Sequence, residues 1–112
     1  MSPALNLCSV AQSGWKPAGR NAGVDFRKQG AVLAVELRHW ASGERLEVRQ
    51  RAELREEMGA VLEGRYELVC GDERYELEAG DGILVPPGEP HSWRVLSDGG
   101  VLYRVSCIGS AP

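Results

Sequence analysis

A histidine behind a bend rich in proline and glycine is the feature of this sequence best suited to chemistry. His91 ends the stretch GDGILVPPGEPH, residues 80–91, in which three prolines surround Gly88. Proline fixes its own φ and limits the freedom of the unfolded chain, so the bend aims the side chain that follows it. An imidazole with a pKa near 6.5 suits either a metal ligand or an acid/base group. A turn histidine satisfied by backbone groups is the alternative.

A second histidine lies on a predicted strand. In AVLAVELRHW, residues 31–40, alternation places Leu33, Val35, Leu37 and His39 on one face, and we expect this face to point inward. A histidine on such a face is usually a satisfied core residue. The alternative is that His39 supplies a relocated metal ligand, forming a site with His91 and a glutamate.

The clearest local element is a β-hairpin. RYELVC and ERYELE flank the two-residue turn Gly71-Asp72, which is typical of a tight hairpin. The turn predicts that Tyr66 pairs with Leu77 and Arg65 with Glu78, giving one core face and one charged face. The stretch ELREEMGAVLEG, residues 53–64, is ambiguous, but its glycines and Val61 favour a strand. Inner faces are expected to hold the aromatic residues Tyr66, Tyr75, Trp93 and Tyr103.

Length and composition predict a single all-β domain. The chain has 112 residues and 14 glycines, nearly twice the usual share, which indicates many turns between short strands. About eight short strands without a long helix indicate a sandwich or barrel. We expect residues 1–30 to form an irregular arm with a possible short edge strand, and residues 31–112 to form the barrel.

Several classes of partner are disfavoured by the same data. The net charge of −3 gives no electrostatic reason to propose nucleic acid as a partner. No run is long and apolar enough to predict a membrane span, and the first residues do not resemble a signal peptide. The three cysteines show no CxxC spacing, which argues against a disulfide framework or a cysteine zinc site. We therefore expect a cytoplasmic protein.

Two spaced motifs resemble those of the cupins, which are small jelly-roll barrels. Gly80, Pro86, Gly88 and His91 match the second cupin motif, and Glu57 with Gly64 resembles the end of the first. The resemblance covers roughly residues 31–108. It implies a cupin-type jelly-roll β-barrel, built as an antiparallel double-stranded β-helix. It also implies a homodimer.

The first motif departs from the metal-binding cupins, which usually carry His-x-His before the glutamate. The corresponding positions are Arg51 and Glu53 in one register, or Gln50 and Ala52 with a gap longer by one residue, and neither register holds a histidine. If a divalent ion (Zn, Fe, Mn or Ni) is bound, its ligands would be Glu53, Glu57 and His91. Arginine has only donors and stays charged, so Arg51 cannot ligate a cation. Our favoured hypothesis is that Arg51 replaces the lost metal, so that no cofactor is bound.

Three functions follow from these residues. The first is a binding module for a small polar or anionic ligand, with a pocket formed by Arg51, Glu57, His91, Trp93, Tyr66 and His39. The second is a metal-dependent cupin enzyme of the dioxygenase, isomerase or decarboxylase type, using Glu and His ligands. The third is a metal-free acid/base isomerase that uses His91 with Tyr66 or a glutamate. The absent His-x-His pair favours the first.

Overall fold

The computed structural model describes residues 25–49 and 56–107, which form nine β-strands and no helix. The strands are β1 (Phe26–Gln29), β2 (Leu33–Trp40), β3 (Arg45–Val48), β4 (Glu57–Glu63), β5 (Arg65–Cys70), β6 (Glu73–Glu78), β7 (Gly82–Val85), β8 (His91–Val95) and β9 (Gly100–Cys107). Within these ranges no helix is available to cross a membrane. The predicted all-β fold class is confirmed.

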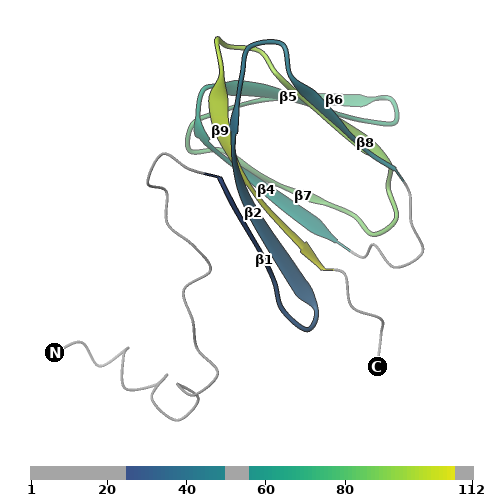
Figure 1. The fold of residues 1–112 in the computed structure, drawn as a ribbon. Helices are drawn as coiled ribbons and strands as arrows, with labels where there is room; N and C mark the ends of the chain where they lie inside the picture. The colour runs from purple at the N-terminus through teal and green to yellow at the C-terminus, as the bar shows by residue number, and fades with distance from the viewer. Residues whose placement is uncertain (1–24, 50–55, 108–112) are drawn as a thin grey trace, which may run out of the picture.

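Two antiparallel sheets face each other, as Figure 1 shows. The five-stranded sheet has the order β1-β2-β9-β4-β7, and the four-stranded sheet has the order β3-β8-β5-β6. Strands distant in sequence therefore become neighbours, with β9 between β2 and β4 and β8 between β3 and β5. These crossovers make the jelly roll that the motifs predict.

The core lies between the sheets. Its buried members are Trp40, Val61, Tyr66, Leu68, Val85, Trp93, Val95 and Leu102. The Trp40 and Tyr66 rings meet edge to face at 5.4 Å between centroids, and Tyr66 meets Trp93 at 6.5 Å. Burying a large apolar side chain contributes roughly 1.5–3 kcal/mol. This chain of aromatic contacts therefore ties the two sheets together.

The predicted hairpin is confirmed. β5 and β6 pair in the expected register, with Tyr66 opposite Leu77 and Arg65 opposite Glu78. Gly71 begins the turn with φ of 61°, a conformation that costs a glycine little. The Arg74 guanidinium contacts the Glu67 carboxylate diagonally across the pair. Alternation and turn chemistry together were sufficient to predict this element.

β2 shows the predicted alternation, but the face that points inward is the one opposite to the face that the sequence analysis expected. Trp40 belongs to the core, and Glu36 bonds Arg104 beside the buried Glu57. The interior side of β2 is therefore that of Glu36, Arg38 and Trp40. His39 lies on the outer face of the sheet, so the expectation that it points inward is wrong.

β9 shows the same reversal. Leu102 belongs to the core, so Tyr103 lies on the outer face of the sheet. There its ring packs against Phe26 at 6.3 Å between centroids. Tyr75 is 40% exposed at the edge strand β6. Of the four aromatic residues expected inside, Tyr66 and Trp93 are fully buried.

Two stretches that the sequence left uncertain include regular strands. The ambiguous stretch at 53–64 contains β4, as its glycines and Val61 predict. β1 lies inside the expected arm of residues 1–30 and forms the edge of the five-stranded sheet beside β2. Asp25 helps to hold its start, because its Oδ1 accepts a hydrogen bond of 2.6 Å from the backbone N–H of His39.

Candidate functional site

A buried carboxylate lies at one end of the space between the sheets. Glu57 begins β4 and is 2% exposed. Its Oε2 atom lies 2.8 Å from His91 Nε2, 3.1 Å from Trp93 Nε1 and 3.2 Å from Arg104 Nε. Its Oε1 atom lies 2.7 Å from Arg104 Nη2 and 3.2 Å from Ser106 Oγ. We call Glu57, His91, Trp93, Arg104 and Ser106 the Glu57 cluster.

Strand register brings the Glu57 cluster together. Glu57 pairs with Ser106 across β4 and β9, and Arg104 lies two residues away on the same side of β9. His91 and Trp93 belong to β8 in the facing sheet. Because they are two residues apart, their side chains lie on the same, inner side of that strand. Residues far apart in sequence therefore converge on one carboxylate.

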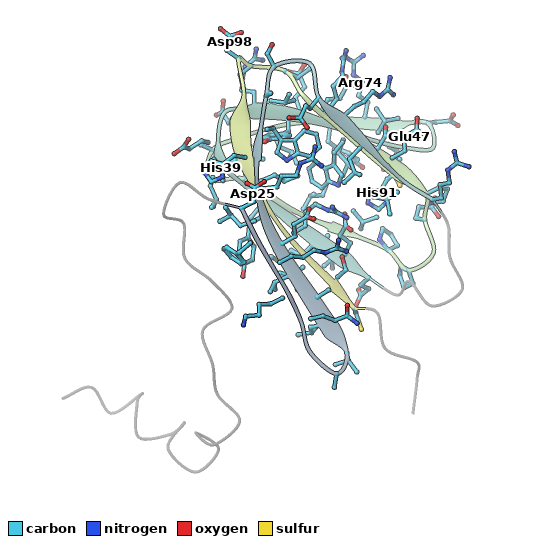
Figure 2. The ribbon with its side chains drawn as sticks, viewed as in Figure 1. Asp25, His39, Glu47, Arg74, His91 and Asp98 are labelled. Carbon is cyan, nitrogen blue, oxygen red and sulfur yellow. The ribbon has the colours of Figure 1, made fainter. Side chains whose placement is uncertain are left out.

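The bend before β8 also fixes the protonation of His91. The Nδ1 atom lies 2.8 Å from the Glu89 carbonyl oxygen, inside the proline-rich bend. A carbonyl oxygen can only accept, so Nδ1 donates to it. The Nε2 atom faces the ionised Glu57 carboxylate and must donate as well. His91 is therefore an imidazolium, and Figure 2 shows it between the two sheets.

The pKa values of the Glu57 cluster reflect this pairing. Burial is the largest influence on Glu57 and would raise its pKa, but hydrogen bonds from His91 and Arg104 outweigh it and lower the pKa to about 2. Burial would lower the pKa of His91, yet the bonds to Glu57 and to the Glu89 carbonyl raise it overall. Arg104 behaves likewise, with its pKa raised by Glu57 despite burial. The contacts among the three groups therefore favour the charged form of each one.

Arg104 is the functional candidate that the sequence analysis did not find. It binds Glu57 through two nitrogens, and its Nη1 atom donates to Glu36 Oε1 at 3.1 Å. The available signal was a lone charged residue in the apolar strand VLYRVSC. Assigning Tyr103 to the inner face placed Arg104 outside.

The described members of this cluster do not fit a divalent metal ion. Glu57 accepts five hydrogen bonds on its two oxygens, and both His91 nitrogens carry protons. The fixed charge of Arg104 would repel a cation at the same position. Within residues 25–49 and 56–107, no group of three His, Cys, Asp or Glu side chains could hold a metal.

The remaining predicted site residues are dispersed. Tyr66 is a core residue with no exposed surface. His39 Nδ1 lies 3.0 Å from Asp25 Oδ1, away from the Glu57 cluster, and Figure 2 shows the two side by side. Arg51 and Glu53 lie outside the described residues. Of the predicted set, Glu57, His91 and Trp93 are brought together.

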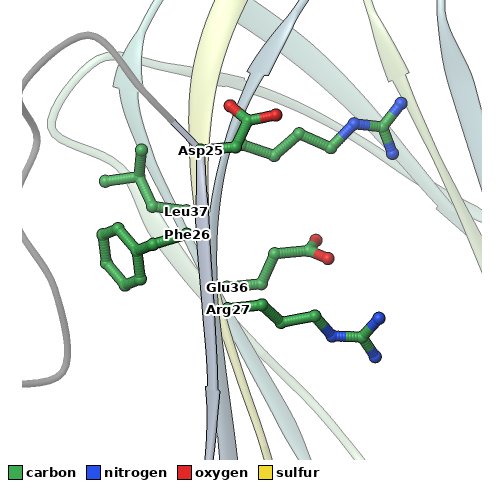
Figure 3. Close-up of a pocket in the computed structure, with 6 residues that line it drawn as sticks. Asp25, Phe26, Arg27, Glu36 and Leu37 are labelled. Carbon is green, nitrogen blue, oxygen red and sulfur yellow. The ribbon is translucent and has the colours of Figure 1, made fainter.

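An open hollow lies nearby along β1 and β2. It has a volume of about 250 Å³ and is lined by Asp25, Phe26, Arg27, Glu36, Leu37 and Arg38; we call it the β1–β2 hollow. In Figure 3 the Asp25, Arg27 and Glu36 side chains extend to one side of the strands, and Phe26 and Leu37 to the other. A smaller hollow beside it shares Arg27 and Glu36 and reaches Arg104 and Ser106. Arg104 and Ser106 of the Glu57 cluster thus border the smaller hollow.

The charged residues that line the β1–β2 hollow differ in whether they have an ion-pair partner. Asp25 contacts His39, Glu36 binds Arg104, and Arg38 pairs with Glu44. Arg38 also lies over the Trp40 ring at 4.3 Å. Arg27 is exposed and forms no ion pair with any residue in the described ranges. Among the residues that the structure describes, it is the cation of the β1–β2 hollow that has no ion-pair partner.

Comparisons with known proteins agree with this architecture. The family model described as "Cupin domain" matches residues 36–106. An uncharacterised protein of Methanocaldococcus jannaschii, MJ1618, is 33% identical over 57 residues, which are 51% of this chain and 44% of that protein. The chain thus aligns with less than half of that relative's length.

Solved structures show the same fold. One is an HTH_3 family transcriptional regulator from Vibrio cholerae, with a TM-score of 0.67 and 14% identity over 77% of this chain and 51% of that one. Another is a cupin superfamily protein, DSY2733, from Desulfitobacterium hafniense, with a TM-score of 0.65 and 17% identity over 76% of each chain. The chain spans about half of the first of these proteins. At such identities the likeness shows the fold alone.

Proposed function

This chain belongs to the cupin family, and from that premise we propose that it is a metal-independent module that binds a small anionic molecule. The ligand would carry a carboxylate or phosphate group and would enter the β1–β2 hollow. Arg27 would bind the anionic group, and the Glu57 cluster would form the rigid wall beside it.

The observation that carries this proposal is the charge balance of the hollow. Every other charged residue that lines it has an ion-pair partner, whereas Arg27 has none among the described residues. A guanidinium presents a planar fork that matches the two oxygens of a carboxylate or phosphate. The volume of about 250 Å³ is suited to a small molecule rather than a polymer.

The charged state of the Glu57 cluster supports binding in preference to catalysis. The His91 side chain has no exposed surface, and both of its nitrogens are engaged. Tyr66 is also fully buried, and burial raises the pKa of its hydroxyl. A substrate in the β1–β2 hollow would not reach either group, which weakens the case for an acid/base isomerase.

Replacing Arg27 tests the proposal. We expect isothermal titration with inorganic phosphate and with succinate to detect binding of at least one, and Arg27→Gln to raise its Kd about tenfold or more. That range follows from the loss of a charged hydrogen bond, worth roughly 1.5–3 kcal/mol.

Lys28→Gln is the matched control. Lys28 follows Arg27 on β1 and points to the opposite face of the sheet. The Lys28→Gln substitution therefore removes the same charge at a position outside the hollow. Its Kd should stay close to that of the parent protein. If both variants weakened anion binding equally, the effect would come from net charge and not from Arg27. If neither phosphate nor succinate bound the parent protein, the proposal would be contradicted.

A further inference from the structure

Two opposite charges lie across from each other on β1 and β2 without forming an ion pair. Arg27 and Glu36 are directly opposite in the register of the two strands, so their side chains leave the sheet close together and on the same side. Figure 3 shows both side chains extending to that side. Opposite charges in such positions attract each other and stabilise the pairing of the strands. Within the described ranges, however, Arg27 pairs with no carboxylate, that of Glu36 included.

Arg104 explains why this pair stays open. Glu36 lies between Arg27 on β1 and Arg104 on β9, since it is the register partner of both. The Arg104 Nη1 atom donates to Glu36 Oε1 at 3.1 Å, while the other two nitrogens of Arg104 are bound to Glu57. Glu36 Oε2 accepts no hydrogen bond from the residues that the structure describes. The carboxylate of Glu36 is therefore held by its other neighbour, with one oxygen left to accept.

Arg27 and Glu36 are also the two residues that line both the β1–β2 hollow and the smaller hollow beside it. The volume of the β1–β2 hollow, about 250 Å³, is several times the roughly 30 Å³ that one water occupies in the liquid. The charges of its lining balance, with the cations Arg27 and Arg38 against the carboxylates Asp25 and Glu36. An anionic group bound at Arg27 therefore lies beside carboxylates that repel it. A ligand that also carries a positive charge would turn this repulsion into attraction.

We propose that the ligand of the β1–β2 hollow is a small amino acid, in which an ammonium group accompanies the carboxylate; this inference rests on the anion-binding function proposed for Arg27. The carboxylate of the ligand binds the Arg27 guanidinium, and its ammonium donates to Glu36 Oε2. One molecule then satisfies both members of the open cross-strand pair. A simple dicarboxylate satisfies Arg27 alone and is repelled by Glu36. Glu36 is therefore the residue that determines specificity for an ammonium group.

L-Aspartate and succinate test the inference, because they share one carbon skeleton and two carboxylates and differ by the α-ammonium. In isothermal titration of the parent protein at pH about 7, the Kd of aspartate should be lower than that of succinate by about tenfold or more, the effect of one charged hydrogen bond. Glu36→Gln should raise the aspartate Kd by about tenfold and should not raise the succinate Kd, so the preference disappears. The amide oxygen of the variant can still accept from Arg104.

Glu76→Gln is the matched control. Glu76 is exposed on β6 in the other sheet, so its substitution removes the same charge away from the hollow and should keep the preference for aspartate. If succinate or phosphate bound the parent protein at least as tightly as aspartate, this inference would fail and the anion site at Arg27 would stand. If none of the three bound, both would fail. A preference that survived Glu36→Gln would overturn the role of Glu36. The comparison of ligands on the parent protein does not depend on whether the variant folds.

Discussion

Replacing Glu57 by glutamine is expected to lower the free energy of unfolding by about 3–5 kcal/mol, the cost of removing one member of a buried ion cluster. The amide carries no charge, so it cannot neutralise His91 and Arg104. Its NH₂ group is a hydrogen-bond donor and would lie against the N–H donors of these two residues, where no acceptor is available to it. Single domains of this kind are stable by about 5–15 kcal/mol. The variant would therefore be marginally folded, as urea denaturation followed by circular dichroism should reveal.

Glu56→Gln is the control for this change. Glu56 precedes Glu57 and is exposed, so the same substitution removes a charge without disturbing the Glu57 cluster. Its free energy of unfolding should stay within about 0.5 kcal/mol of the parent, as is usual for surface positions. A loss below 1 kcal/mol for Glu57→Gln would show that the carboxylate does not organise this end of the barrel.

Adding one methyl group at Gly59 is the second substitution with a large expected effect. A Cβ there would lie 2.4 Å from Cη2 and 2.5 Å from Cζ2 of the Trp93 indole. Trp93 is fully buried and its Nε1 is held by Glu57, so the ring has little room to move. We expect Gly59→Ala to lower the free energy of unfolding by about 1–3 kcal/mol through overpacking.

A double-mutant cycle isolates this contact. Phenylalanine at position 93 lacks the two crowded indole atoms, so Gly59→Ala should cost much less in a Trp93→Phe background, with a coupling of about 1 kcal/mol or more. Gly82→Ala is the control, since its Cβ would lie 3.5 Å from the Gly59 carbonyl oxygen, an ordinary contact. Purely additive costs would show that Gly59 is not required for the approach of the indole.

The fold and three members of the Glu57 cluster, Glu57, His91 and Trp93, were predictable from sequence. The spacing from Gly80 to His91 and the pair Glu57 and Gly64 predict the barrel, and the barrel brings Glu57 and His91 together. The hairpin followed from its turn and its alternation. These features depend on local chemistry and on spacing, which a single sequence contains.

Arg104 and the position of His39 were not predictable for a physical reason. Alternation in a strand gives two faces but does not say which one points inward when both are apolar. In β9, one face has Leu102 in the core, and the opposite face carries the apolar residues Tyr103 and Val105. Because β2 and β9 carry apolar residues on both faces, their sequences do not show which face points inward, and so they do not show that Arg104 binds Glu57.

The central claim is that protein cations, in place of a metal, neutralise Glu57. Ring-nitrogen NMR of His91 tests it directly in protein purified without chelator, with His39→Gln assigning the signals of the two histidines. The two hydrogen bonds of His91, from Nδ1 to the Glu89 carbonyl and from Nε2 to the Glu57 carboxylate, predict an imidazolium with both nitrogens protonated at pH about 7.5, where an ordinary histidine is about one tenth charged. One equivalent of zinc should leave both signals unchanged. A neutral ring whose Nε2 signal shifts with zinc would contradict the account.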